Sequence, residues 1–289
     1  MKKIRFGPAG TSDSFTAQGF KKNIQVPDYL VGMGLSAFEY QCGRGVRISQ
    51  EAAREFGVVA AEKDIQLSVH APYYISMSSV EPEKREKSID YVLQSARAVN
   101  ALGGDRIVIH TGSCGKISRE EALVLASDTF RKCIAALDAE GLSHIHMCPE
   151  TMGKANQLGT LEEVLTLCRL DDRMLPCIDF GHLNARTFGG MNSPEAFSAV
   201  FEKMENAIGA DRMRTFHAHF SKIQYTNPGG EKMHLTFADT IFGPDFEPLA
   251  ELLVKKDCTP TIICESAGTQ AEDAAKMKEM YILAGGRKL

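Results

Sequence analysis

Short apolar runs alternate with amphipathic helical stretches along almost the whole chain, and this alternation restricts the possible folds more than any other feature. Each run has the length of a strand, and apolar residues recur at helical spacing in most of the stretches between them. Eight such runs occur, at residues 4–7, 37–40, 66–70, 106–110, 145–150, 175–179, 214–220 and 261–265. Apolar strands that alternate with helices predict a parallel sheet covered by helices.

Local signals mark where several helices begin. Ser118 and Thr160 each precede a glutamate by three residues, which is the spacing of a capping box. Ser193-Pro194 combines an N-cap residue with proline at the first helical position. Residues 221–244, which follow the seventh apolar run, form a polar stretch with several glycines, and we expect a loop there.

The eight β-α units predict one closed (β/α)₈ TIM barrel that spans residues 1–289 as a single domain. A chain of this length would also suit two average domains. No linker-like or low-complexity stretch divides it, however. An open, doubly wound sheet is the alternative, but no G-x-G-x-x-G follows the first strand, and this favours the barrel.

Composition limits the possible compartments and partners. The net charge of −4 gives no overall basic signature of nucleic-acid binding, so a polyanion would need a local patch or metal ions. The eight cysteines include no C-x-x-C pair and several lie in apolar runs, as in proteins of a reduced cytoplasm. The N-terminus lacks the apolar core of a signal peptide, and no apolar run approaches membrane length. We therefore expect a soluble, cytoplasmic protein.

Potential metal ligands end six of the predicted strands. They are His70, His110, Glu150, Asp179, His217 and Glu265, and His182 follows three residues after Asp179. The C-terminal strand ends of a TIM barrel converge at one mouth, so these side chains would share a pocket. A single strand-end histidine is more often structural, but buried carboxylates are costly unless they are paired or coordinated. The set therefore predicts a site for more than one ion, with zinc or manganese suited to imidazole and carboxylate ligands.

The motifs around these ligands, in their order along the chain, resemble the endonuclease IV family. The matching segments are residues 69–73, 109–113, 149–153 with 156–159, 177–182, 217–222 and 264–266. The resemblance covers nearly the whole chain. It implies a TIM-type barrel that holds three zinc ions and cuts the DNA backbone on the 5′ side of an abasic site.

The resemblance also implies how the ligands are shared. One zinc ion would bind His70, His110 and Glu150, and a second would bind Glu150, Asp179, His217 and Glu265. His182 would hold a third ion, which the family completes with an Asp-x-His motif. This chain has Glu231-Lys-Met-His234 there, so Glu231 and His234 either rebuild the site by a different loop path or leave the third metal weak or absent.

A second departure lies in the seventh strand. His219 stands where the family has an asparagine, two residues after the strand-seven histidine. Alternate residues of a strand share one face, so His219 could add a ligand or contact the substrate. These two departures leave the exact activity open.

The expected reaction is metal-assisted hydrolysis of a phosphodiester in damaged double-stranded DNA by a monomeric enzyme. Metal ions can activate water and clamp the phosphate. Glu150 would set the metal spacing, and Glu265 would orient the attacking water. Tyr73 matches a family tyrosine that contacts opened DNA. The loops also carry basic residues for a DNA-binding rim, namely Arg44, Arg47, Lys116, Lys154, Arg186, Lys222 and Lys232.

Two other functions remain open. Sugar isomerases and epimerases with the same barrel bind one metal ion, and here they would use Glu150, Asp179, His217 and Glu265. Such an enzyme does not need the other three histidines, at positions 70, 110 and 182. A barrel that binds metal without catalysis is the third possibility, but six intact strand-end ligands argue against it.

Overall fold

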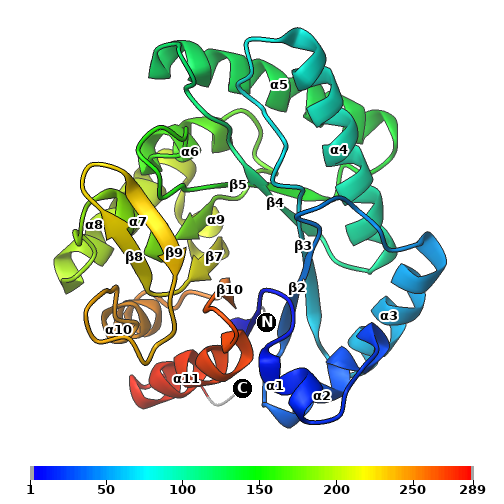
Figure 1. Cartoon of the computed structure of the whole chain (residues 1–289), viewed down its shortest axis with the longest axis vertical. Coiled ribbons are helices and arrows are strands. Elements are labelled where there is room, and N and C mark those ends of the chain that lie inside the picture. The colour runs from blue at the N-terminus through cyan, green and yellow to red at the C-terminus, as the bar shows by residue number, and fades with distance from the viewer. Residues whose placement is uncertain (1–2, 288–289) are drawn as a thin grey trace.

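The computed structural model describes residues 3–287, and Figure 1 shows their parallel strands arranged as a ring around a central axis. The strands follow each other in the order β1-β10-β7-β6-β5-β4-β3-β2. Between β1 and β2, the Gly10 N–H donates to the Glu39 carbonyl at 3.0 Å and completes the ring. The predicted (β/α)₈ barrel is confirmed. Its strands are β1 (Arg5–Pro8), β2 (Ala37–Gln41), β3 (Gln66–His70), β4 (Arg106–His110), β5 (His146–Glu150), β6 (Cys177–Asp179), β7 (His217–Phe220) and β10 (Thr261–Cys264).

Helices surround the barrel and connect its strands (Figure 1). The predicted caps are present, since the Ser118 hydroxyl accepts from the Glu121 N–H at 3.1 Å and the Thr160 hydroxyl from the Glu163 N–H at 3.2 Å. The helices are α1 (Asp13–Ala17), α2 (Val26–Gly32), α3 (Gln50–Glu62), α4 (Pro82–Ala101), α5 (Arg119–Ala139), α6 (Leu161–Cys168), α7 (Phe180–Arg186), α8 (Pro194–Ile208), α9 (Ala210–Arg214), α10 (Glu247–Lys255) and α11 (Gln270–Leu283), with a 3₁₀ turn at Asn23–Gln25.

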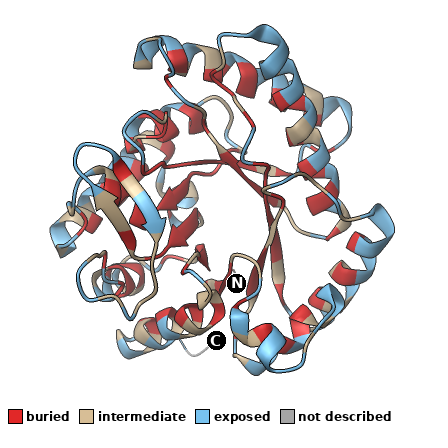
Figure 2. Ribbon diagram, viewed as in Figure 1, coloured by how far each residue is buried: buried red, intermediate tan, exposed pale blue. Residues whose placement is uncertain are grey.

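The hydrophobic core lies between the strands and the helices. Figure 2 shows buried residues along the strands and on the helix faces that point at them, with exposed residues on the outer faces. All eight cysteines are buried and free. Within the described part of the chain, no helix is both long enough and apolar enough to cross a bilayer.

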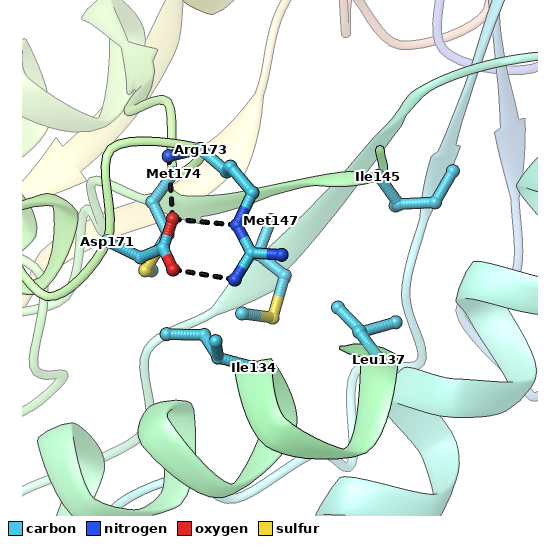
Figure 3. Close-up of a pocket in the computed structure, with 7 residues that line it drawn as sticks. All are labelled: Ile134, Leu137, Ile145, Met147, Asp171, Arg173 and Met174. Atoms are coloured by element: carbon cyan, nitrogen blue, oxygen red, sulfur yellow. Dashed lines mark hydrogen bonds and ion pairs between the residues drawn. The ribbon is translucent and has the colours of Figure 1, made fainter. Parts of the chain in front are cut away.

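A small void lies between α5 and β5, lined by Ile134 and Leu137 of the helix and Met147 of the strand. Figure 3 shows it among apolar side chains, with the carboxylate of Asp171 and the guanidinium of Arg173 facing each other at its rim. The two groups form a forked pair with N–O distances of 2.9 and 2.7 Å. The void measures about 10 Å³, close to the smallest space that holds one water molecule. It is therefore a packing feature and not a ligand site.

The structure corrects two of the expected elements. Residues 221–244 are not a plain loop, because they contain the hairpin of β8 (Ile223–Thr226) and β9 (Gly230–His234). Both strands lie at the surface above the barrel, so they lack the apolar alternation that marks a half-buried strand. The strand expected at 214–220 begins only at His217, because Arg214 still belongs to α9.

Candidate metal centre at the mouth of the barrel

The C-terminal strand ends bring three groups of potential ligands together. In each group the donor atoms lie within 4.8 Å of one another. A pocket of about 330 Å³ opens above them. The groups are His70, His110 and Glu150; Glu150, Asp179, His219 and Glu265; and His182, Glu231 and His234. A fourth group combines His219 with Cys177 and His217, which lie lower in the barrel because they begin β6 and β7.

The first group joins β3, β4 and β5. The Nε2 atoms of His70 and His110 lie 3.4 and 3.3 Å from the same oxygen, Oε2 of Glu150. The Nδ1 of His70 lies 2.8 Å from the Ala71 carbonyl, which can only accept a hydrogen bond. The proton of the neutral ring is therefore held on Nδ1, and the Nε2 lone pair faces Glu150.

The second group surrounds the other oxygen of Glu150. The Nδ1 of His219 lies 3.1 Å from Glu150 Oε1 and 3.5 Å from Glu265 Oε1. Two buried carboxylate oxygens, Glu150 Oε2 and Asp179 Oδ2, have imidazole nitrogens 3.1–3.4 Å away but accept no well-aligned hydrogen bond from any residue that the structure describes. Because buried carboxylate oxygens without hydrogen bonds are costly, this donor set fits divalent cations.

The third group includes the hairpin. His182 faces it through Nε2, which lies 3.4 Å from Glu231 Oε2, while its Nδ1 lies 2.9 Å from the Thr151 carbonyl. The hairpin reaches this position because the Glu231 N–H donates to the Gly153 carbonyl at 3.2 Å. Gly153 allows the close approach, since a Cβ at that position would lie 2.6 Å from the Cβ of Glu231.

A β-bulge lets both hairpin residues face His182. Tyr225 pairs with Glu231 and Gln224 pairs with Met233, so Lys232 has no partner in the ladder. One extra residue reverses the alternation of side chains along the strand. Glu231 and His234 therefore share a face at a spacing of three residues, where a regular strand would need two.

Burial and neighbouring charges shift the acid–base properties of these groups. Burial raises the pKa of Asp179 to about 6, against the opposing charge of His182. Burial also disfavours ionised Glu150, but the charge of His219 and the close imidazoles of His110 and His182 outweigh it, so the Glu150 pKa lies well below its usual value. Burial opposes protonation of His219, yet the surrounding anionic groups raise its pKa well above the usual value. Protonated imidazoles thus balance the buried carboxylates, and bound cations could take over that role.

The structure corrects the placement of His217. This residue begins β7 instead of ending it, and it lies below the mouth with its Nε2 3.0 Å from Glu39 Oε2. His219, two residues further along the same inward face, occupies the mouth position that was expected for His217. The sequence contained a signal for this arrangement. When two histidines lie on the same face of a strand, the later one is closer to the C-terminal end of the strand.

The residues expected to contact DNA divide into two kinds. Tyr73 is 56% exposed and its ring stacks 5.5 Å from that of His110, while Arg44 is exposed in the loop after β2. Lys222 is not a free rim charge, because its Nζ donates to the Asp239 carbonyl at 2.8 Å and pairs with Asp245 at 2.9 Å. Lys222 therefore binds residues of the following loop, and its charge does not face the pocket rim.

Arg186 also differs from its expected role on the rim. Its guanidinium donates to four backbone carbonyls of the loop after β5, at Met152 (2.8 Å), Lys154 (2.9 Å), Ala155 (3.2 Å) and Gln157 (3.0 Å). Three residues of that loop, Met152, Lys154 and Gln157, line the pocket. Of these, Lys154 was expected from its position, whereas Met152 and Gln157 had no sequence signal of their own as pocket residues.

Comparisons with known proteins agree with this geometry at the level of the family. Residues 27–281 match a family described as xylose isomerase-like TIM barrel. An uncharacterized protein of Methanocaldococcus jannaschii is 32% identical over 276 residues, which is 94% of this chain and 95% of the relative. A probable endonuclease 4 of Oceanobacillus iheyensis is 26% identical over 216 residues, or 71% of this chain and 70% of the relative.

Solved structures with the same fold include both enzyme classes considered above. Endonuclease IV from Thermus thermophilus superposes with a TM-score of 0.67 at 18% identity, covering 97% of this chain and 98% of that one. A D-tagatose 3-epimerase-like protein superposes with a TM-score of 0.70 at 19% identity, covering 97% of each chain. At these identities the likeness concerns the fold alone.

Proposed function

The chain belongs to the family of xylose isomerase-like TIM barrels, and we propose that it is a metal-dependent endonuclease that cuts DNA on the 5′ side of abasic sites. The observation that carries this proposal is the presence of three adjoining donor groups instead of one. A one-ion sugar enzyme would use only the group of Glu150, Asp179, His219 and Glu265. It would leave His70, His110 and the His182 group without a function.

We assign zinc as the resident metal, with manganese as the alternative that the same ligands allow. His70 and His110 would hold the first ion together with Glu150. Glu150 would also bind the second ion, together with Asp179, His219 and Glu265. His182, Glu231 and His234 would hold the third.

The bound ions would activate water and stabilise the negative charge on the phosphate oxygens. Glu150 sets the spacing of the first two positions, since its Oε2 faces His70 and His110 while its Oε1 faces His219. The Glu265 side chain lines the pocket from the residue after β10 and is more accessible than that of Glu150, being 14% exposed against 1%. It is thus placed to orient the attacking water and accept its proton.

Recognition of DNA would depend on the rim of the pocket. A phosphodiester is repelled by the carboxylates unless cations neutralise them, so metal binding has to precede productive binding. Lys154 is exposed and lines the pocket, which places a positive charge next to the donor groups. Tyr73 stands exposed beside His110, where its ring can pack against an opened base pair. Arg44 would contact the backbone from the neighbouring loop.

The test is cleavage of an end-labelled duplex that contains one stable abasic analogue, with protein loaded with zinc or with manganese. We expect a single product cut on the 5′ side of the analogue, and bound metal near three equivalents by elemental analysis. An intact abasic duplex together with one ion per chain and turnover of a ketose would overturn the proposal in favour of the epimerase. The matched control is an undamaged duplex of the same sequence.

A further inference from the structure

A second layer of buried polar residues lies directly below the candidate metal centre. Its central residue is Glu39 of β2, which is completely buried. Glu39 Oε2 lies 3.0 Å from His217 Nε2 and accepts a hydrogen bond from the Ser68 hydroxyl at 2.9 Å. Its other oxygen, Oε1, lies 3.0 Å from Nε2 of His219. The proposed mechanism uses His219 but has no function for Glu39.

His219 connects the two layers through its two ring nitrogens. Nδ1 points to the mouth, where it lies 3.1 Å from Glu150, and Nε2 points down to Glu39. The Nε2 contact is short but lies off the axis of the N–H bond, so it acts as an ion pair and not as a straight hydrogen bond. A ring that binds a cation through Nδ1 must carry its proton on Nε2. Only a negative or hydrogen-bond-accepting neighbour at Nε2 favours that tautomer.

We propose that Glu39 is a positioning residue for the metal centre: its carboxylate holds the His219 proton on Nε2 and so turns the Nδ1 lone pair toward the mouth. The inference rests on the proposed metal-dependent function. A carboxylate behind a ligating imidazole fixes the ring and increases its basicity. His217 and Ser68 hold the carboxylate in turn, since both contact Oε2, while Oε1 faces His219 and also accepts a hydrogen bond from the Gln41 side-chain amide at 3.3 Å.

The structure supports a polar and not merely space-filling role for Glu39, since both of its carboxylate oxygens meet polar side chains. A buried carboxylate with a role only in packing would be replaced by an apolar residue at little loss. Its position one layer below the mouth keeps it out of the pocket, whose lining does not include Glu39.

The experiment compares metal binding by the full-length wild-type protein, Glu39→Gln, Glu39→Asp and Ser68→Ala. Affinity is measured for zinc by competition with a chelating indicator, and the coordination of cobalt is followed by its visible absorption spectrum. Glu39→Gln keeps the size of the side chain and removes its charge. Ser68→Ala is the matched control, because it removes a buried contact of the same carboxylate that does not involve His219.

We expect Glu39→Gln to weaken one class of metal site by roughly 10–100-fold and to change the cobalt spectrum. Glu39→Asp should lie between wild type and Glu39→Gln, and it carries the test if the glutamine variant does not fold. Ser68→Ala removes one hydrogen bond of the carboxylate but keeps its charge, so it should weaken metal binding less than Glu39→Gln does. Wild-type metal binding with unchanged affinity and spectrum in both Glu39 variants would overturn this inference alone. A wild-type protein that binds no metal would overturn the proposed function as well.

Discussion

Glu231 and His234 face the same side of β9 although they are three positions apart, because the bulge at Lys232 reverses the alternation of the strand between them. Both side chains therefore reach the group around His182. The departure from a two-residue spacing thus does not by itself remove the third donor group. The backbone compensates for the extra residue in the sequence.

This geometry predicts the effect of changing the spacing. Deletion of Lys232 would remove the bulge and make β9 a regular strand. Glu231 and His234 would then be two positions apart and would still share a face. We expect the deletion variant to keep the metal content of the wild type by elemental analysis. Insertion of one alanine after Met233 should turn His234 to the opposite face and lower the content by about one ion per chain. Equal metal content in the insertion variant would contradict the assignment, and Lys232→Ala is the control.

The two histidines of β7 should differ in their mutant phenotypes. His219→Ala removes a ligand at the mouth, and we expect loss of metal and at least a hundredfold loss of abasic-site cleavage. His217→Ala leaves the mouth intact but deprives Glu39 of one partner, so we expect near-wild-type metal stoichiometry and a free energy of unfolding lower by roughly 3 kcal/mol. Urea unfolding and elemental analysis of both variants check this. Metal loss in His217→Ala with retention in His219→Ala would reverse the assignment.

Arg186 should act on the pocket through the loop after β5. Arg186→Ala removes a side-chain donor from four carbonyls of residues 152–157, although Arg119 still donates to those of Ala155 and Gln157. We expect faster amide hydrogen exchange in that loop. KM for an abasic duplex should rise more than kcat falls, because Lys154 and Gln157 would lose their fixed positions. The control is Arg131→Ala, which removes an exposed charge of α5 that is not part of the predicted rim. An unchanged exchange rate in the loop would refute this role.

The free energy of unfolding should depend on pH through the ionisation of Glu163. Burial opposes its ionisation, but hydrogen bonds from Arg119 and from the N–H groups of Gly159 and Thr160 lower the pKa of Glu163 below its usual value. When the pKa of a carboxyl is lower in the folded than in the unfolded state, its ionisation stabilises the fold at pH values above the unfolded-state pKa. This contribution disappears as the pH falls through the folded-state pKa. We expect Glu163→Gln to lower the free energy of unfolding by about 1–3 kcal/mol at pH 7. In urea unfolding, the difference from wild type should shrink as the pH falls below about 4. A difference independent of pH would contradict this.

Much of the architecture follows from local patterns in the sequence. Apolar strands, helical spacing and capping residues such as Ser118 act over a few neighbouring positions, so they can be read without knowledge of long-range contacts. The same holds for the strand-end positions of His70, His110 and Glu150. The topology of the barrel then requires these ends to converge, whatever the detailed packing.

Other parts of the site depend on contacts that the sequence does not encode locally. The sequence by itself determined the barrel, its mouth and most of the ligand types, because periodicity and strand order decide these. Only the tertiary structure decided that His219 lies at the mouth and His217 beneath it, since that depends on where β7 begins. It also decided that a bulge at Lys232 aligns Glu231 with His234, and that Glu39 reaches His219 from the far side of the barrel. These relationships join strands that are distant in sequence, and backbone register and packing determine them.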